Sequence, residues 1–284
     1  MKTGLVLEGG GVRGVFTAAV LEVFKENGIC FDYGNGTSAG AVMLSNFIEG
    51  NTKRINTILM SDGDSSYIGI KELLKTGNYM NLQKLYDVIL NDSPAFDYDS
   101  YFYNKMEREY VATCCETGKP EYFTDDFTKE HFKDVGCASC SLPILSKPYT
   151  INGRNYMDGS ISDPLPIDRA FYKGCDKLIV ISTKGPGMEP SDLAKYLWFM
   201  KLIYPSSFKP FFEAIRTRIK RVEDAYEYLE ALEKEGRIMV IHPQSVAISH
   251  LEKDTDKVRL LYKEGYQYAT ENLGKIKQFL EIVG

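Results

Sequence analysis

The amino-acid sequence predicts an α/β protein with three layers, in which helices cover both faces of a central, mostly parallel sheet. The first 50 residues alternate twice between strand and helix patterns, an order typical of parallel strands joined by helices. Further apolar runs with strand character occur at 177–182 and 237–242. The last third of the chain has helical periodicity, so we expect a helical C-terminal third.

The composition is that of a globular protein without a strong net charge. The 284 residues include 34 Lys and Arg against 39 Asp and Glu, which gives a formal net charge of −5. Apolar residues make up 44% of the chain, which excludes a disordered or collagen-like protein. The mild acidic excess gives no reason to expect nucleic acid as a partner. The three histidines limit any catalytic scheme that depends on imidazole.

The sequence shows no recognisable secretory signal or membrane-spanning segment. Its N-terminus enters a strand pattern without the charged start, long apolar run and cleavage site of a signal peptide. The most apolar stretch, 197–204, is far shorter than the about 20 residues that cross a bilayer. We therefore expect a cytoplasmic protein with reduced cysteines.

The first elements are predicted from local patterns. Residues 4–7 form a short apolar run that stops at a glycine cluster, as a buried strand does. Helical spacing follows over 15–24 and ends at Asn27-Gly28. A second strand begins at 30–33, and a second helix is expected over 39–48.

Later elements follow from apolar runs and turn residues. The region 55–105 is expected to be mainly helices and loops, and Asn152-Gly153 is the strongest short signal for a hairpin. Besides the two runs named above, the expected strands cover 107–115, 121–123, 148–151 and 154–157. One long helix is expected from about 206 to Gly236, and another after Asp254. We expect a core over 1–185 and a mainly helical part over 186–284 that completes the same or an adjoining domain.

A glycine-rich loop follows the first strand and opens the first helix. It has the pattern GxGxxG and consists of Gly9, Gly10, Gly11, Val12, Arg13 and Gly14. One interpretation is a dinucleotide site, with Asp32 as the ribose-binding acid. Another is an oxyanion hole, because consecutive glycines expose backbone N–H groups to a carbonyl oxygen that gains negative charge. A third is a tight turn without a ligand, and the loop alone does not decide between them.

The turn between the second strand and the second helix favours the oxyanion hole. It has the pattern GxSxG, with Ser38 flanked by Gly36, Thr37, Ala39 and Gly40. In this context the motif is a nucleophile elbow, a sharp turn with a strained serine backbone and small neighbours. The elbow places the Ser38 hydroxyl at a helix N-terminus, where the helix dipole stabilises negative charge.

A serine nucleophile needs a base, and histidine is one candidate. His242 follows the last expected strand, about where a hydrolase with the order Ser, Asp, His has its histidine. A strand-end residue before Pro243 explains His242 as well, and we prefer that interpretation. His131 is expected on a helix surface, and His250 lies in an unpatterned loop.

Asp158 is the other candidate base. It leaves the second strand of the expected hairpin and enters a turn with Gly159 and Ser160, which fixes its carboxylate. A partly shielded carboxylate within hydrogen-bond reach of Ser38 is able to act as general base.

Cys137 and Cys140 match the pattern CxxC. No second pair and no histidine at ligand spacing accompany them. We interpret both as small buried residues and predict no metal site.

Glycine loop, GxSxG and Asp-Gly, in this order and spacing, resemble the patatin-like phospholipase family of acyl hydrolases. The matching residues are 9–14, 36–40 and Asp158-Gly159, with weaker matches at 73–78 and 138–143. The resemblance covers residues 4 to about 185. Two departures are Ser160, where the family often has Gly or Ala, and Gly34-Asn35, where apolar or small residues are usual.

The resemblance implies a patatin-like fold and a serine lipid acyl hydrolase without histidine, metal or organic cofactor. Ser38 would attack an ester carbonyl, Asp158 would take the proton, and backbone amides from Gly10 to Arg13 would hold the oxyanion. A water activated by Asp158 would then release the acyl group. The implied substrates are fatty acyl esters, phospholipids or lysophospholipids among them.

Residues 196–221 combine aromatic and basic side chains. They include six Lys or Arg and one acidic residue, Glu213. Such a segment is able to contact a lipid surface. The alternative, which we prefer, is a helix whose apolar stripe packs on the sheet while its basic face is solvated.

Two other functions are weighed against the hydrolase. The first is a nucleotide- or dinucleotide-binding protein that uses the loop 9–14 and Asp32, and the second is a catalytically idle scaffold. Asp32 lies at the start of its strand segment, whereas a ribose-binding acid belongs at the end, which counts against the first alternative. The sequence makes no prediction of oligomeric state.

Overall fold

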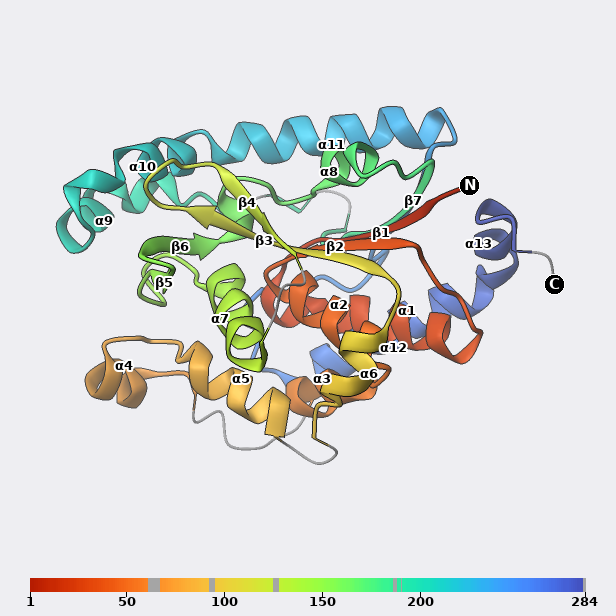
Figure 1. Ribbon diagram of the computed structural model, residues 1–284, viewed down its shortest axis with the longest axis horizontal. Coiled ribbons are helices and arrows are strands. Elements are labelled where there is room, and N and C mark those ends of the chain that lie inside the picture. The colour runs from red at the N-terminus through yellow and green to blue at the C-terminus, as the bar shows by residue number, and fades with distance from the viewer. Residues whose placement is uncertain (61–66, 92–94, 125–127, 186–187, 190, 283–284) are drawn as a thin grey trace.

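A mixed sheet forms the centre of the protein (Figure 1). The computed structural model describes residues 1–60, 67–91, 95–124, 128–185, 188–189 and 191–282. The strands lie in the spatial order β5 (Tyr149–Ile151), β6 (Arg154–Asp158), β3 (Glu107–Cys114), β2 (Tyr33–Thr37), β1 (Thr3–Leu7), β7 (Lys177–Ile181) and β8 (Ile238–Ile241), and β4 (Pro120–Phe123) pairs with β3. Strands β3, β2, β1, β7 and β8 are parallel, whereas β4, β5 and β6 pair in antiparallel fashion. The predicted, mostly parallel sheet is confirmed.

Helices cover both faces of the sheet, in the three layers that the sequence predicts (Figure 1). One face carries α1 (Gly14–Glu26), α2 (Ala39–Glu49) and α12 (Thr255–Glu271), and the other carries α8 (Ile167–Tyr172) and α11 (Arg218–Lys234). Successive side chains of a strand point to opposite faces. In β1, Leu5 and Leu7 accordingly pack in the cluster with α1 and α2, while Val6 packs in a second cluster with Leu229 and Leu232 of α11.

Shorter elements complete the layers. The helices are α3 (Lys53–Met60), α4 (Ile70–Thr76), α5 (Leu82–Asn91), α6 (Tyr98–Tyr103), α7 (Lys129–Cys140), α9 (Leu197–Ile203), α10 (Lys209–Arg216) and α13 (Leu273–Phe279). Single 3-10 turns are η1 (Gly11–Arg13), η2 (Gly159–Ile161), η3 (Ala194–Tyr196) and η4 (Ser206–Phe208). The expected helices and loops of 55–105 are confirmed by α3 to α6, with 61–66 and 92–94 outside the described residues.

Strands β5 and β6 form the expected hairpin. Asn152 and Gly153 both have positive φ, 50° and 76°, which suits a two-residue turn between twisted strands. The hairpin joins the sheet because β6 pairs with β3, where Asp158 lies opposite Ala112.

Residues on both sides of position 185 share one sheet and one core. Strand β8 pairs with β7, and α12 packs along α1. Val258 and Leu261 of α12 are buried in the same cluster as Val15 and Phe16 of α1.

The prediction of a single long helix between 206 and Gly236 is wrong. The helix is divided at Thr217 into α10 and α11, after the turn η4. The two parts pack on different clusters: Phe211 of α10 joins Met157 near the hairpin, whereas Leu229 of α11 packs on the sheet. The Thr217 hydroxyl donates to the carbonyl of Glu213 (3.0 Å), a local bond that favours a helix end.

The register of the sheet brings the predicted site residues together. Parallel strands β1 and β2 pair Leu7 with Gly36, so the glycine loop and the elbow follow the strands at the same end, the C-terminal one. Strand β3 lies between β2 and β6, and Asp158 lies opposite Ala112 on it. Ser38 and Asp158 therefore meet although 120 positions separate them in the sequence.

Candidate active site

Ser38 occupies the sharp turn between β2 and α2. Its backbone has φ 56° and ψ −124°, the strained conformation that the elbow motif predicts. The Ser38 N–H donates to the Ser139 hydroxyl (2.9 Å), which donates to the Val111 carbonyl (2.7 Å). Ser139, near the end of α7, thus ties the elbow to β3.

The Ser38 hydroxyl donates a short hydrogen bond to Asp158. Its Oγ lies 2.6 Å from Asp158 Oδ2, while Oδ1 accepts the backbone N–H of Ser160 at 2.9 Å. Ser38 is 7% exposed and Asp158 is fully buried. A carboxylate held in this way is able to accept the hydroxyl proton during nucleophilic attack.

The surroundings of Asp158 make its carboxylate more basic than usual. Burial raises the pKa of Asp158, and it outweighs the hydrogen bonds from Ser38 and Ser160 and the charge of Arg218, all of which lower it. A base is more effective when its pKa lies nearer to the working pH. The shift therefore suits a general base.

The glycine loop lies directly against the nucleophile. A Cβ atom at Gly9 would lie 2.9 Å from Ser38 Cβ and 3.0 Å from the Thr37 carbonyl oxygen, so the approach requires glycine. Among the described residues, the N–H groups of Gly9, Gly10 and Gly11 donate to no protein acceptor. They are available to a substrate oxygen.

The other N–H groups of the loop are used within the protein. That of Val12 donates to the His250 carbonyl (3.1 Å), that of Arg13 to the Gly10 carbonyl (3.2 Å), and that of Gly14 to carbonyls of the preceding turn. Of the six residues expected to form the oxyanion hole, only Gly9, Gly10 and Gly11 therefore remain as candidate N–H donors.

A buried acid, Glu8, anchors the loop at the end of β1. Its Oε2 accepts the Thr183 N–H (2.8 Å) and the Tyr226 hydroxyl (2.9 Å), and its Oε1 lies 3.1 Å from Lys184 Nζ. Burial opposes the charge of Glu8, but Lys184 and the hydrogen bonds outweigh it and keep the pKa of Glu8 below its usual value. The Thr183 hydroxyl also donates to the Gly9 carbonyl (2.6 Å).

His242, the alternative base, makes its contacts elsewhere. Its Nδ1 lies 3.0 Å from the Pro243 carbonyl oxygen and 3.1 Å from Gln244 Nε2, after the end of β8. His131 lies in the first turn of α7, and His250 meets the glycine loop through its backbone.

Asp32 lies at the opposite end of the strands from the glycine loop and the elbow. Its Oδ2 accepts the N–H (2.7 Å) and the hydroxyl (3.1 Å) of Thr3, where β1 begins, whereas the glycine loop follows the end of β1. A ribose-binding acid belongs at the C-terminal ends of the strands. The position of Asp32 therefore argues against a dinucleotide site.

The two cysteines of the CxxC pattern are buried on α7. Burial and the charge of Asp158 raise the pKa of the Cys140 thiol to about 12, so it stays protonated. Within the described residues, no group of three His, Cys, Asp or Glu side chains is placed to hold a metal ion. The helices described for this chain include none that is long and apolar enough to span a membrane.

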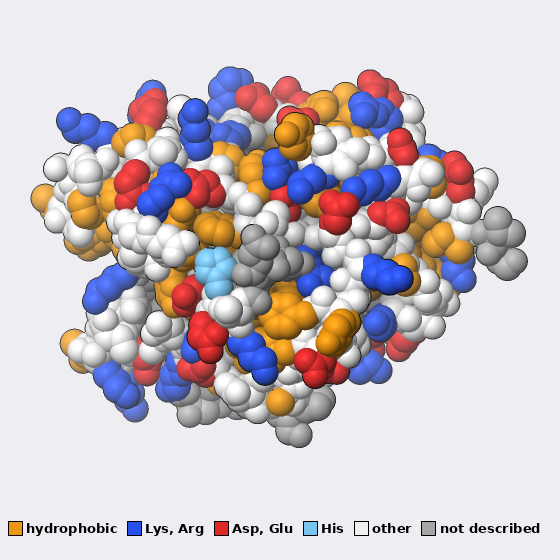
Figure 2. Space-filling view, in the orientation of Figure 1, with side chains coloured by type: hydrophobic (Ala, Val, Ile, Leu, Met, Phe, Trp, Pro, Cys, Tyr) orange, Lys and Arg blue, Asp and Glu red, His pale blue; other side chains and the backbone are white. Residues whose placement is uncertain are grey.

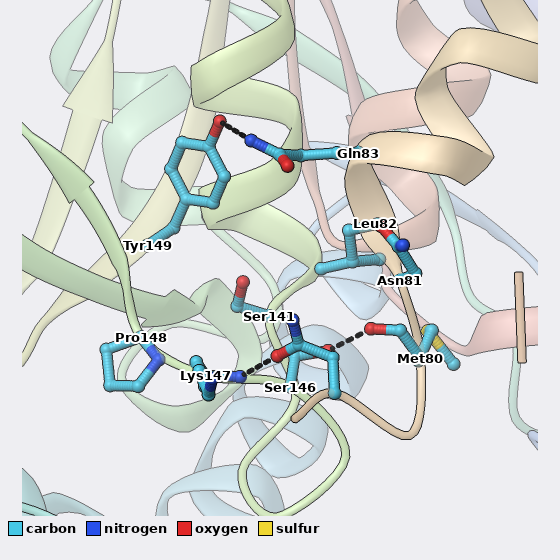
Figure 3. A pocket seen from close by; sticks show the side chains of 10 residues that line it. Met80, Asn81, Leu82, Gln83, Ser141, Ser146, Lys147, Pro148 and Tyr149 are labelled. Carbon is cyan, nitrogen blue, oxygen red and sulfur yellow. Dashed lines mark hydrogen bonds between the residues drawn. The ribbon is translucent and has the colours of Figure 1, made fainter. Parts of the chain in front are cut away.

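A hollow of about 170 Å³ lies beside the segment between α7 and β5 (Figure 3). Ser141 and Tyr149 line it, and Tyr149 faces Gln83, whose Nε2 lies 3.3 Å from its hydroxyl oxygen. Neither Ser38 nor Asp158 lines this hollow, although the carbonyl of its lining residue Ser141 accepts the Asp158 N–H (2.8 Å).

Three supporting residues were missed by sequence reasoning. Glu8 directly precedes the glycine loop, and Ser139 lies in the segment 138–143 that resembles the family. Their positions next to recognised motifs were therefore a weak indication that both support the site. Arg218, whose Nε donates to the Ser160 carbonyl (3.1 Å), was only one of six basic residues in its segment.

Two family models match the chain. The model described as patatin-like phospholipase covers residues 5–171, more than half of the chain. A second model, described as a domain of unknown function (DUF6363), covers residues 208–281.

Individual proteins are similar over much of the chain. An uncharacterized protein, YjjU of Escherichia coli, is 29% identical over 250 residues, which are 85% of this chain and 68% of YjjU. Triacylglycerol lipase 5 of Saccharomyces cerevisiae is 25% identical, and the match covers 59% of this chain but 28% of the lipase. Lysophospholipase nte1 of Aspergillus niger is 24% identical over 98% of this chain and 18% of its own length. The crystal structure of VipD from Legionella pneumophila has the same fold, with a TM-score of 0.54, 15% identity and coverage of 96% of this chain and 67% of VipD.

Proposed function

The chain belongs to the patatin-like phospholipase family and is a carboxylic ester hydrolase, and we propose that it cleaves fatty acyl esters with a dyad of Ser38 and Asp158. The observation that carries the proposal is the 2.6 Å hydrogen bond between Ser38 Oγ and Asp158 Oδ2 in a buried site. Two relatives are named as a triacylglycerol lipase and a lysophospholipase, which supports lipid substrates. Phospholipids and lysophospholipids are the substrate class that we propose.

In the proposed reaction, Ser38 Oγ attacks the ester carbonyl carbon while its proton moves to Asp158 Oδ2. The carbonyl oxygen becomes negative and accepts hydrogen bonds from N–H groups among Gly9–Gly11. The tetrahedral intermediate then collapses, and the proton on Asp158 passes to the departing alcohol. Water, deprotonated by the same carboxylate, attacks the acyl-enzyme; Ser38 Oγ is released, regains the proton, and a fatty acid leaves.

A catalytically idle scaffold is the less favoured function. A chain that had lost catalysis would have no need for a serine in a strained backbone conformation, which costs about 1–3 kcal/mol. Here the strained serine, the carboxylate and the unoccupied N–H groups occur together.

A covalent serine probe tests the nucleophile. We expect a fluorophosphonate to label the protein once, on the peptide that contains Ser38, because attack on phosphorus uses the same serine and base as attack on an ester. The measurement is mass spectrometry of the digested adduct, with His242→Ala as the matched variant that should label at the same rate. Stoichiometric labelling of another serine, or loss of labelling in folded His242→Ala, would contradict the dyad.

We also propose that α9 contacts the lipid surface that holds the substrate. Its outer face exposes large apolar side chains, with Trp198 67% and Leu202 74% exposed. Its inner face packs on the protein through Met200, which lies in the cluster that contains Met157, the residue before Asp158 in β6. In Figure 2, hydrophobic side chains lie at the left edge of the molecule, where Figure 1 places α9.

The charge around α9 suits an anionic lipid surface. Residues 193–212 contain Lys195, Lys201 and Lys209 and no Asp or Glu, and all three lysines are exposed. A basic residue near an anionic surface contributes about 1 kcal/mol, and burial of a large apolar side chain about 1.5–3 kcal/mol. The chain's net charge of −5 does not prevent this, since screening confines the interaction to nearby charges.

Removal of the apolar face of α9 should weaken membrane contact without affecting chemistry. We expect the double variant Trp198→Glu, Leu202→Glu to bind vesicles of phosphatidylcholine and phosphatidylglycerol about 100-fold more weakly than the wild type. Vesicle co-sedimentation measures binding, and hydrolysis of a soluble short-chain ester should be unchanged. Leu260→Glu on α12, at a position that is 53% exposed, is the matched control and should bind like the wild type. Equal binding of the double variant and the wild type would contradict the role of α9.

A further inference from the structure

The segment 208–281 contacts both the glycine loop and the turn that follows Asp158. From this segment, which the model of a domain of unknown function covers, Arg218 contacts the turn after Asp158 and His250 contacts the glycine loop. We propose that this segment holds the active site in its catalytic geometry, with Arg218 as a positioning residue for Asp158. The inference rests on the proposed dyad.

Arg218 acts on Asp158 through Ser160. It is the first residue of α11 and is 9% exposed. Its Nε donates to the Ser160 carbonyl (3.1 Å), and its Nη1 donates to the Ser191 carbonyl (3.1 Å). The N–H of the same Ser160 donates to Asp158 Oδ1 (2.9 Å), which leaves Oδ2 directed to Ser38. Because a guanidinium is planar and its donors are fixed in direction, Arg218 limits the rotation of this turn.

Arg218 also supplies positive charge to a buried carboxylate. The groups that act on Asp158 are the hydroxyl of Ser38 on the elbow, Ser160 in its own turn, the thiol of Cys140 on α7 and Arg218 on α11. Cys140 remains neutral, so Arg218 is the cation among these groups. It counteracts burial, which raises the pKa of Asp158, and so keeps the carboxylate ionised to lower pH.

The same segment holds the glycine loop. The His250 carbonyl accepts the Val12 N–H at 3.1 Å, and a Cβ at Gly11, where φ is +57°, would lie 2.3 Å from that carbonyl oxygen. Tyr226 of α11 donates to Glu8, the anchor of the loop. Residues from one C-terminal segment therefore fix the base and the expected oxyanion donors relative to each other.

The test is the pH dependence of Ser38 labelling by a fluorophosphonate in full-length variants. In Arg218→Gln we expect the maximal labelling rate to fall about 10–100-fold. We also expect the acid limb of the pH–rate profile, which follows ionisation of the base, to move to higher pH. Arg218→Lys keeps the charge but not the planar group, so its acid limb should stay near that of the wild type while its maximal rate remains reduced.

Arg221→Gln is the matched control. Arg221 also lies in the first turn of α11 and donates to the Ile161 carbonyl (2.8 Å), but its charge acts on Asp163 instead of Asp158. Its loss should lower stability and leave the acid limb unchanged. If the acid limb and the maximal rate of Arg218→Gln both coincide with those of Arg221→Gln, the positioning role is wrong. Where the glutamine variant does not fold, a maximal rate of Arg218→Lys equal to that of Arg221→Gln leads to the same conclusion. Failure of wild-type Ser38 to label would instead reject the dyad itself.

Discussion

Replacement of Ser38 by alanine should lower kcat for hydrolysis of a fatty acyl ester by about 10⁴-fold or more, the loss typical of serine hydrolases without their nucleophile. Alanine has no hydroxyl to attack the carbonyl, and the substitution removes the oxygen that lies 2.6 Å from Asp158 Oδ2. Release of fatty acid from a lysophospholipid measures the effect. The oxyanion donors of the glycine loop remain, so a small residual rate above the uncatalysed reaction is expected.

Ser38→Gly is the control that separates lost chemistry from a lost fold. At φ 56° and ψ −124° glycine is not strained, and relief of the strain exceeds the entropic cost of glycine. Both variants lose the hydrogen bond to Asp158, but only glycine relieves the strain. Ser38→Gly should therefore be inactive and about 1 kcal/mol more stable than Ser38→Ala by denaturant unfolding. Activity retained in either variant would reject Ser38 as the nucleophile.

Asp158→Asn should lower kcat by about 10³- to 10⁴-fold. The amide has the shape of the carboxylate and keeps both contacts, with its oxygen on the Ser160 N–H and its nitrogen facing Ser38 Oγ. It is unable to accept the hydroxyl proton, so the nucleophile is not activated. Steady-state hydrolysis of a soluble ester measures the loss, and full activity of the folded variant would exclude Asp158 as base.

The same substitution should raise stability at neutral pH. The pKa of Asp158 is higher in the folded protein than in the unfolded chain because of burial. Between these two pKa values the folded state binds more protons than the unfolded state, so the free energy of unfolding of the wild type falls as pH rises through this window. The amide side chain of the variant does not ionise and avoids this loss, and its advantage should disappear below the unfolded pKa. Chemical denaturation at neutral and acidic pH measures the difference.

The order of the first elements and the proximity of Ser38 and Asp158 were predictable because they depend on local patterns. The run 4–7, the glycine loop and the GxSxG turn each restrict the backbone within a few residues. Asp158 was a candidate base because the Asn152-Gly153 turn fixes the register of a hairpin that ends at this residue. In each case the chemistry of the site lies next to the turn that positions it.

The supporting contacts were not predictable because they join distant parts of the chain. Arg218 reaches Ser160 across 58 positions, and Tyr226 reaches Glu8 across 218. Nothing near Arg218 in the sequence distinguishes it from the solvated basic residues around it. The break at Thr217 was missed for a related reason: helical periodicity continues through it, and only packing on two separate clusters shows that the direction changes.

The packing of α12 along α1 has a consequence for the synthesis of the protein. The ribosome makes the glycine loop, α1 (Gly14–Glu26) and Ser38 long before α12 (Thr255–Glu271), the helix that covers α1. At about 5–20 residues per second, the nascent chain presents the apolar side of α1 for roughly tens of seconds. The catalytic loops are therefore made long before the helix that completes the core around α1. A chain truncated before α12 should leave this apolar side uncovered and aggregate or be degraded.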